Sequence, residues 1–164
     1  MKHLKSLDLS GNDIGSESIE ILASSHSLCK LVKLNVSHTA IGDEGVKYIA
    51  YSSFMKNLKQ LIAQSINATN FSCIGTSENM NNLVVLDLTK NENITDASIH
   101  AILNSSILNK LKRLRIREGN DDRLATLIEN SSLFSNLEDW SPQRVQTKSN
   151  LFTIAVEYLT GFFK

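Results

Sequence analysis

A leucine ladder that recurs six times constrains the fold of this chain more than any other feature. Its first copy reads Leu-Lys-Ser-Leu-Asp-Leu over residues 4–9, and the first leucines of successive copies are 27, 27, 25, 28 and 26 residues apart. The copies begin at Leu4, Leu31, Leu58, Leu83, Leu111 and Leu137. A fixed period in the twenties is typical of a solenoid, in which neighbouring units stack because none buries its apolar face alone. The sequence therefore predicts a repeat protein with one continuous core.

Each repeat is expected to contain a short strand, a turn and a helix. The ladder leucines alternate with polar residues, which places the leucines inside and the residues between them outside. In residues 16–25, Ile19, Leu22 and Ala23 fall at helical spacing and form one apolar stripe. Because strand and helix recur in one order, consecutive strands must be parallel and the helices must share one face.

Local signals predict how some helices begin and where the pattern weakens. In the third repeat, Ala63 stands where the third ladder leucine belongs, and residues 67–80 carry only three large apolar side chains. We expect a broken or short helix there. The expected amino-terminal caps are Asp43, Thr95, and either Asn120 or Asp121.

Two motifs of the sequence resemble the ribonuclease-inhibitor-like class of leucine-rich repeats. The motif Leu-x-x-Leu-x-Leu-x-x-Asn-x-Ile from Leu4 to Ile14 and the run Ile-Gly-Asp-Glu-Gly-Val from Ile41 carry the resemblance. The repeat lengths also overlap the F-box-associated and bacterial-effector versions. The resemblance implies an α/β solenoid, a right-handed superhelix with a parallel concave sheet and convex helices. The class serves inhibitors, ligase receptors, GTPase regulators and pathogen effectors, so it implies a protein partner without naming one.

The chain divides into a leucine-rich repeat domain, residues 1–140, and a carboxy-terminal segment, residues 141–164. Residues 149–164 form a helical pattern with an unusually wide apolar arc. We interpret this segment as a cap on the last repeat, with a dimer contact or insertion into a neighbour's groove as alternatives. Nothing precedes Leu4 to cover the first strand, so we expect either a fragment or an edge covered by a partner or a second copy.

The composition limits the partners and the reactions that we expect for this chain. The 164 residues include 17 basic and 17 acidic side chains, so zero net charge favours neither nucleic acid nor anionic membranes. Cys29 and Cys73 lack partners at metal or redox spacing and are expected to be free thiols. No signal peptide or membrane span is visible, which indicates a cytoplasmic protein, in a host cytoplasm if the chain is an effector. We expect no cofactor, no metal site and no catalytic constellation, and hence no enzyme.

The outward face of the strands holds the candidate binding residues. Three arginines line the fifth strand, Ile62 and Val85 place an apolar spot beside them, and Asp87 is placed to pair with Arg115. Either the arginines are solvated or neutralised by Asp87, Glu118, Glu138 and Asp139, or they dock an acidic or phosphorylated partner. The candidate concave-face residues are Lys33, Asn35, Gln60, Ile62, Val85, Asp87, Arg113, Arg115 and Arg117.

The preferred interpretation is a protein-interaction scaffold, with a bacterial effector-type protein as one form. The alternatives are a GTPase-activating or other enzyme-regulating solenoid, in which an arginine acts on the partner's active site, and the substrate-receptor fragment of a ubiquitin ligase.

Overall fold

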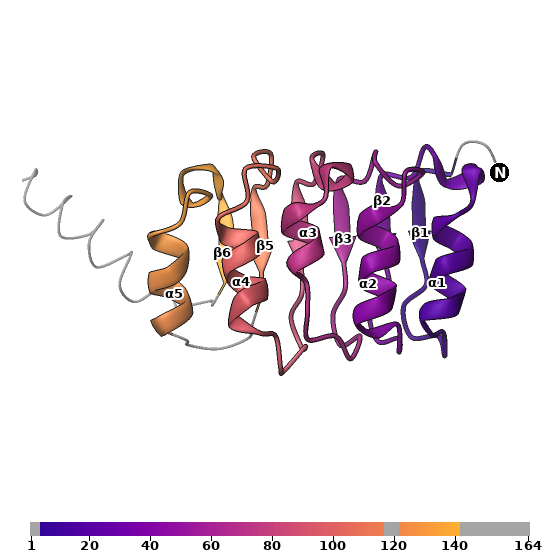
Figure 1. The fold of residues 1–164 in the computed structure, drawn as a ribbon, viewed down its shortest axis with the longest axis horizontal. Helices are drawn as coiled ribbons and strands as arrows, with labels where there is room; N and C mark the ends of the chain where they lie inside the picture. The colour runs from indigo at the N-terminus through magenta and orange to yellow at the C-terminus, as the bar shows by residue number, and fades with distance from the viewer. Residues whose placement is uncertain (1–3, 117–121, 142–164) are drawn as a thin grey trace, which may run out of the picture.

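Six short parallel strands form a single sheet in the computed structural model of the chain, which describes residues 4–116 and 122–141. The sheet order follows the sequence, so every strand pairs with the strand of the next repeat (Figure 1). The strands are β1 (Ser6–Asp8), β2 (Lys33–Asn35), β3 (Gln60–Ile62), β4 (Val85–Asp87), β5 (Arg113–Arg115) and β6 (Asp139–Ser141). The middle residue of each strand is a ladder residue, so the predicted strands are confirmed in position and register.

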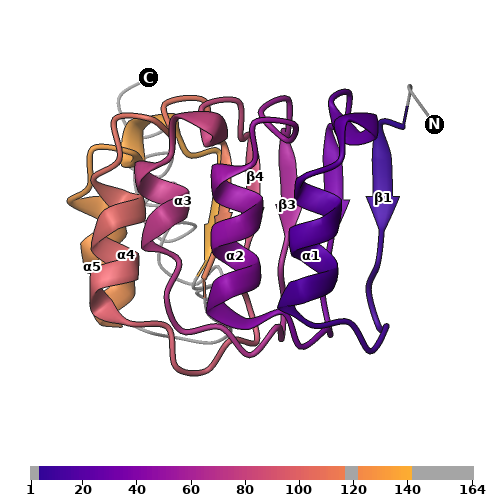
Figure 2. The same cartoon turned by 45° about the vertical axis from the view of Figure 1, so that its right-hand side comes forward.

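Within the described residues, five helices cover one face of the sheet and no helix lies on the other face (Figures 1 and 2). They are α1 (Ser16–Ala23), α2 (Gly42–Tyr51), α3 (Ser72–Thr76), α4 (Asp96–Leu103) and α5 (Asp122–Glu129). Three 3-10 turns, η1 (His26–Leu28), η2 (Glu78–Met80) and η3 (Phe134–Asn136), lead toward the next strand. The predicted architecture, a parallel sheet with helices on its convex side, is confirmed. We call the face of the sheet opposite these helices the concave face.

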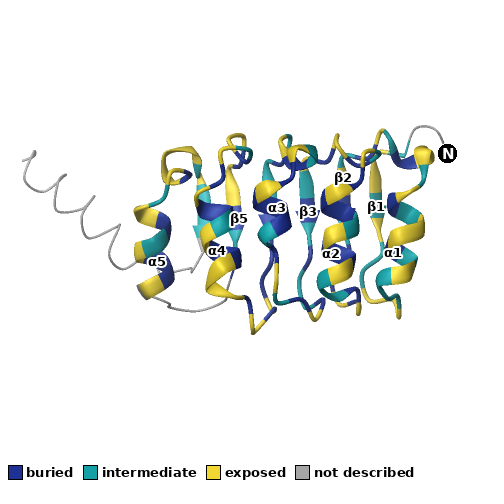
Figure 3. Cartoon of the chain, viewed as in Figure 1, coloured by how far each residue is buried: buried dark blue, intermediate teal, exposed yellow. Residues whose placement is uncertain are grey.

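The core lies between the sheet and the helix layer. The central ladder leucines Leu34, Leu61, Leu86 and Leu114 are fully buried, and the helix stripes pack against them. In α1, Ile19 and Ala23 are buried and Leu22 is half-buried, as the stripe predicts. Exposed positions gather on the outer side of the helices (Figure 3).

The third repeat has the short helix that its sequence predicts. The helix α3 spans only five residues, and Phe71, Ile74 and Met80 are each 0% exposed. Gly75 brings α3 against the backbone of α4, because a side chain there would meet the peptide of Ala101. A short helix with a small residue at its contact therefore compensates for the shorter repeat.

A left-handed backbone residue follows the first four strands at an equivalent position. These residues are Gly11, His38, Ser65 and Lys90, with φ of 70°, 58°, 50° and 62°. Only one of them is glycine, although this region favours glycine. The backbone N–H of His38 donates to the carbonyl of Gln64 at 2.8 Å, so tertiary hydrogen bonding supports the turn. His38 is thus an exposed turn residue.

The predicted helix caps have different outcomes. The Thr95 side chain accepts a hydrogen bond from the backbone of Ser98 at the start of α4, so this cap is confirmed. The Asp43 cap is wrong, because α2 has Ile41 at the cap position and no side-chain cap. The Asp43 carboxylate instead accepts hydrogen bonds from the backbone N–H groups of Thr69 and Asn70, at 2.7 and 2.9 Å. The cap predicted at Asn120 or Asp121 lies outside the described residues.

Buried serines tie each repeat to the one before it. Ser52, Ser77 and Ser105 donate to the carbonyls of Ala23, Ala50 and Gly75 at 2.5, 2.6 and 2.6 Å. Each acceptor lies at or near the end of a helix, where backbone carbonyls lack intrahelical partners. These serines satisfy the free helix ends inside the stack and fix the spacing of adjacent repeats.

Candidate functional site

Strand register arranges the concave side chains in two rows. The row nearer the amino ends of the strands, which we call the first row, contains Ser6, Lys33, Gln60, Val85, Arg113 and Asp139. The second row contains Asp8, Asn35, Ile62, Asp87 and Arg115. Neighbouring strands lie about 4.8 Å apart, so side chains adjacent in a row are within contact distance. Eight of the nine predicted site residues fall in these two rows, and Arg117 lies outside the described residues.

Polar groups of the second row bind neighbouring polar groups of the fold. Asp8 accepts hydrogen bonds from the hydroxyl and backbone N–H of Ser10, at 2.6 and 2.9 Å, and from the Asn35 amide at 3.1 Å. The Ser10 hydroxyl, followed by the Ser10 backbone and Asn35, lowers the pKa of Asp8 below its ordinary value. Because hydrogen bonds to a carboxylate stabilise its charged form, Asp8 is held ionised and in a fixed orientation.

Asp87 repeats this arrangement deeper in the sheet. Its carboxylate accepts from the Thr89 hydroxyl at 2.8 Å, the Thr89 backbone N–H at 3.1 Å and the Gln64 amide at 2.8 Å. Asp87 is only 6% exposed. The pairing of Asp87 with Arg115 expected from their register is wrong, because Gln64 and Thr89 occupy the carboxylate. Asp87 therefore acts within the protein and offers a partner little surface.

The arginine strand is partly neutralised. Arg115 forms an ion pair with Asp139 at 3.2 Å, and both side chains are 43% exposed. Beside it, Lys112 pairs with Glu138 at 2.5 Å. Among the described residues, Asp139 is thus the one carboxylate of the four predicted that pairs with an arginine, because Glu138 pairs with Lys112 and Asp87 binds Gln64 and Thr89. The fourth, Glu118, lies outside the described residues.

The polar first-row side chains of the second, third and fifth repeats are not bonded to other groups of the described fold. Within residues 4–116 and 122–141, Lys33, Gln60 and Arg113 make no side-chain hydrogen bond and no ion pair, and Lys33 and Arg113 are exposed. Val85, between Gln60 and Arg113, is half-buried, as is Ile62 in the adjoining row. The concave face therefore presents a central apolar spot with a free cation on either side, above a row of polar groups that are already bonded.

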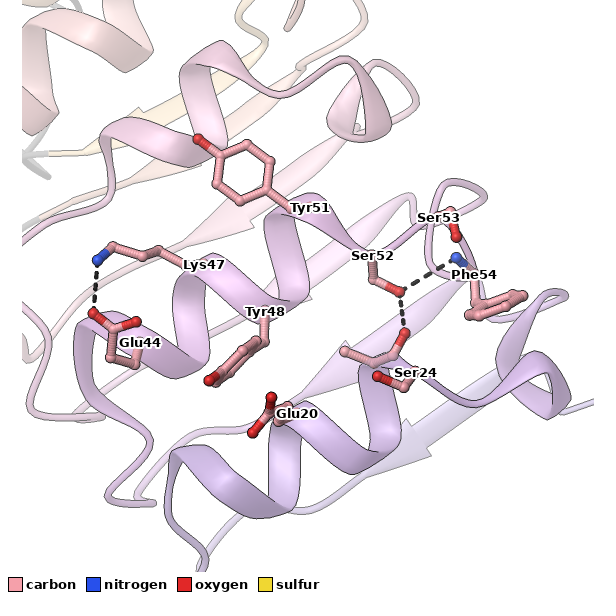
Figure 4. A pocket seen from close by; sticks show the side chains of 10 residues that line it. Glu20, Ser24, Glu44, Lys47, Tyr48, Tyr51, Ser52, Ser53 and Phe54 are labelled. Carbon is pink, nitrogen blue, oxygen red and sulfur yellow. Dashed lines mark hydrogen bonds and ion pairs between the residues drawn. The ribbon is translucent and has the colours of Figure 1, made fainter.

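A groove that the sequence did not reveal lies on the convex side between α1 and α2. This convex groove has a volume of about 460 Å³ (Figure 4). The Tyr48 hydroxyl faces the Glu20 carboxylate, whose negative charge raises the pKa of Tyr48. Lys47 pairs with Glu44 at 2.6 Å, and Tyr51 is 59% exposed. The charged groups of the groove are paired with one another, in contrast to the first row.

The buried cysteine, Cys73, is not placed for nucleophilic chemistry. Both cysteines are free thiols; Cys29 is half-buried and Cys73 is buried. Burial raises the pKa of Cys73 to about 11, so its reactive thiolate form is scarce at neutral pH. In the described part of the chain, no group of three or more His, Cys, Asp or Glu side chains is positioned to hold a metal. No helix of the same residues has both the length and the apolar character needed to cross a membrane.

Comparisons with known proteins agree with this geometry. A family model described as leucine-rich repeat matches residues 1–23, 27–50 and 79–103. The fold is a leucine-rich repeat solenoid. An internalin from Listeria monocytogenes has a similar structure, with a TM-score of 0.51 and 19% sequence identity over 86% of this chain. The chain spans about half of that internalin, 48% of its length. The search of the curated proteins found no match.

Leucine-rich repeat solenoids are in general non-enzymatic scaffolds that bind proteins on extended concave surfaces. The chain accordingly has the architecture of a protein-interaction scaffold.

Proposed function

We propose that the concave face binds a protein partner through the first row, with Lys33, Gln60, Val85 and Arg113 as contacts and Ile62 beside them. The observation that carries this proposal is the difference between the two rows. Polar groups of the second row are saturated by internal hydrogen bonds, whereas Lys33, Gln60 and Arg113 have no bonding partner among the described residues. Free polar groups around an apolar spot are what a binding interface requires.

The second row supports the first by keeping the sheet surface rigid. Asp8 and Asp87 each join their own strand to an amide of a neighbouring repeat, from Asn35 or Gln64. A preorganised surface loses less side-chain entropy on binding, so more of the contact energy appears as affinity. Asp87 thus contributes by positioning the face, whereas Arg113 and Val85 meet the partner.

The partner chemistry follows from charge and shape. Lys33 and Arg113 stand on either side of Val85, so a complementary surface has a central apolar side chain flanked by acidic groups. Arginine is enriched among the residues that dominate interface energies, particularly beside apolar contacts. We therefore propose Arg113 as the main anchor, and Arg115, which is tied to Asp139, as a smaller contributor.

The test is quantitative binding of a partner isolated by affinity capture and then purified. Calorimetric titrations compare the parent chain with Arg113→Ala, Val85→Ala and the convex control Glu129→Ala, which changes an exposed residue of α5. Loss of an anchor often costs ~2 kcal/mol, which corresponds to about thirtyfold in affinity. We expect that loss for Arg113→Ala, a smaller loss for Val85→Ala and no change for the control. Equal losses in all three variants contradict the proposal.

Finer assignments remain predictions. The ribonuclease-inhibitor-like subclass is supported by α-helices on the convex side, and an effector-type protein acting in a host cytoplasm is one form of the scaffold.

An enzyme-regulating solenoid would use Arg113, the free arginine of the described strand, on a GTPase; a panel of GTPases with a hydrolysis readout tests it. A ubiquitin-ligase receptor would need a separate adaptor-binding part. Self-association through the first strand or residues 149–164 is a further prediction, which sedimentation tests.

A further inference from the structure

Basic residues of the first three repeats gather at one edge of the solenoid, where the strands begin. Four exposed lysines lie there: Lys5 just before β1, Lys30 just before β2, and Lys56 and Lys59 before β3. We call these four residues the lysine edge. Lys33, which also lies near this end of the sheet, is counted with the first row.

Backbone contacts bring the members of the lysine edge together. The backbone N–H of Lys33 donates to the carbonyl of Lys5 at 2.9 Å, and that of Lys59 donates to Val32 at 2.8 Å. The Asn57 amide donates to the carbonyl of Cys29 at 2.7 Å, which holds the segments carrying Lys30 and Lys56 side by side. With strands ~4.8 Å apart, the lysine edge extends over about 10 Å of the sheet.

Nothing in the described fold neutralises these lysines. No carboxylate of the described residues forms an ion pair with any of the four, and residues 24–33 and 52–60 contain no Asp or Glu. Three acidic residues of the first two repeats instead lie in the first turns of the helices, namely Glu17, Asp43 and Glu44. Acidic side chains there are explained by the positive ends of the helix dipoles.

Helix dipoles do not explain the position of the lysine edge. Neither α1 nor α2 has a basic residue in its last turn, and the dipole effect decays within that turn. Lys30 and Lys56 lie beyond it, after Ala23 and Tyr51. Unpaired like charges within about a Debye length repel one another, so a cluster of this kind is unfavourable until an anion approaches it.

We propose that the lysine edge is a second binding site, specific for a short acidic segment of a protein. The ligand's carboxylates replace the missing acidic partners. Its length suits a short run of Asp or Glu because the charged surface is only about 10 Å wide. The lysine edge differs from the first row in position and chemistry. Its charges are carried by flexible lysine side chains, and it has no apolar centre.

A nucleic acid fits this edge less well. Nonspecific binding of single strands combines cations with aromatic platforms on which bases stack. The aromatic pair on this side, His26 and Phe54, pack edge to face with centroids 5.5 Å apart, and Phe54 lines the convex groove. The lysine edge also contains no arginine, whose fork suits phosphate.

Fluorescence anisotropy with a labelled tetraglutamate peptide, which spans roughly 13–14 Å when extended, tests the proposal on the full chain. The variant Lys30→Gln, Lys56→Gln, Lys59→Gln removes three charges of the edge. The matched control Lys47→Gln, Lys90→Gln, Arg123→Gln removes three charges elsewhere. A third variant changes the same edge lysines to Arg and keeps the charge. Circular dichroism verifies that all of them fold.

We expect the parent chain to bind the peptide, the edge variant to bind about tenfold more weakly, and the control and arginine variants to bind like the parent. Binding should weaken as salt rises. No binding by the parent, or equal binding by the edge variant, overturns the proposal. Tighter binding of an oligothymidine of equal charge, with the same dependence on the edge lysines, assigns the edge to nucleic acid and also overturns it. Arg113→Ala should leave peptide binding intact, so this test and the concave-face test fail independently.

Discussion

Replacing Gly75 with alanine tests the close approach of α3 and α4, on which the third repeat depends. A methyl group at this position would lie 2.6 Å from the carbonyl carbon of Ala101, nearer still to its oxygen, and 3.0 Å from the nitrogen of Ile102. Unstrained contacts between heavy atoms are roughly 3.5–4.0 Å. The two helices would therefore have to separate by about 1 Å, and both contacting groups are backbone.

The magnitude follows from two opposing effects. Overpacking a filled core costs about 1–3 kcal/mol, and the upper end applies because no flexible side chain gives way. Alanine recovers ~0.8–1.0 kcal/mol through its higher helix propensity. Separating the helices also stretches the 2.6 Å hydrogen bond from Ser105 to the Gly75 carbonyl. We expect a net loss of about 2 kcal/mol in the free energy of unfolding.

For a chain of this size, each kcal/mol shifts Tm by about 2–4 °C, so Gly75→Ala should lower Tm by about 4–8 °C. Thermal unfolding followed by circular dichroism measures the shift. The matched control is Gly15→Ala, where an added methyl meets only the Glu17 carboxylate at 3.9 Å. An unchanged or raised Tm for Gly75→Ala would refute the inferred contact between the two helices.

Three further predictions concern the rest of the molecule. Asp43→Ala should destabilise the fold by about 1–2 kcal/mol, measured by urea unfolding at neutral pH. Burial alone would raise the pKa of Asp43, but backbone hydrogen bonds from Asn70 and Thr69 outweigh burial and lower the pKa. The difference in free energy of unfolding between the parent chain and Asp43→Ala should therefore shrink as pH falls below ~3.9. A difference that stays constant at all pH values contradicts this prediction. Alkylation at pH 8 without reductant should label Cys29 before Cys73 and both after unfolding, because the pKa of Cys73 is raised to about 11; a mass two protons lower would indicate a disulfide. Deleting residues 149–164 should cause aggregation or lower Tm if the segment is a cap, and an unchanged Tm would assign its apolar arc to a partner.

Periodic features of the molecule could be predicted from the sequence. The spacing of the ladder leucines fixes strand register, because every repeat places an equivalent residue opposite its neighbour, as Leu34 lies opposite Leu7 and Leu61. The shortage of apolar residues before Met80 likewise predicts the short α3. In both cases the pattern of apolar residues along the chain is sufficient, and no side-chain partner has to be known.

Side-chain partners were harder to predict, because they lie in adjacent repeats. The Asp43 carboxylate binds Thr69, which is 26 residues away, instead of capping its own helix. Asp87 has Arg115 opposite it in register, but Gln64 on the other side reaches its carboxylate instead. A carboxylate between two repeats can bind either neighbour, and only the three-dimensional arrangement decides between them.

The lysine edge has a signal in the sequence that the repeat pattern alone does not identify as a site. Lysine stands immediately after the first ladder leucine at Lys5, Lys59 and Lys112, and immediately before it at Lys30 and Lys110. These positions flank the ladder and do not follow its alternation, so the ladder pattern does not assign them to the concave face. Only the parallel register shows that they share one edge.

Site-specific photo-crosslinking tests the central claim, that the first row of the concave face contacts the partner, most directly. A photoreactive residue replaces Gln60 on the concave face or Ile21 on α1, where the side chain is 74% exposed on the convex side. The account predicts one crosslinked partner from Gln60, lost when Arg113→Glu is added, and none from Ile21. Crosslinking from Ile21 alone, or a product from Gln60 that persists in the Arg113→Glu variant, would contradict it.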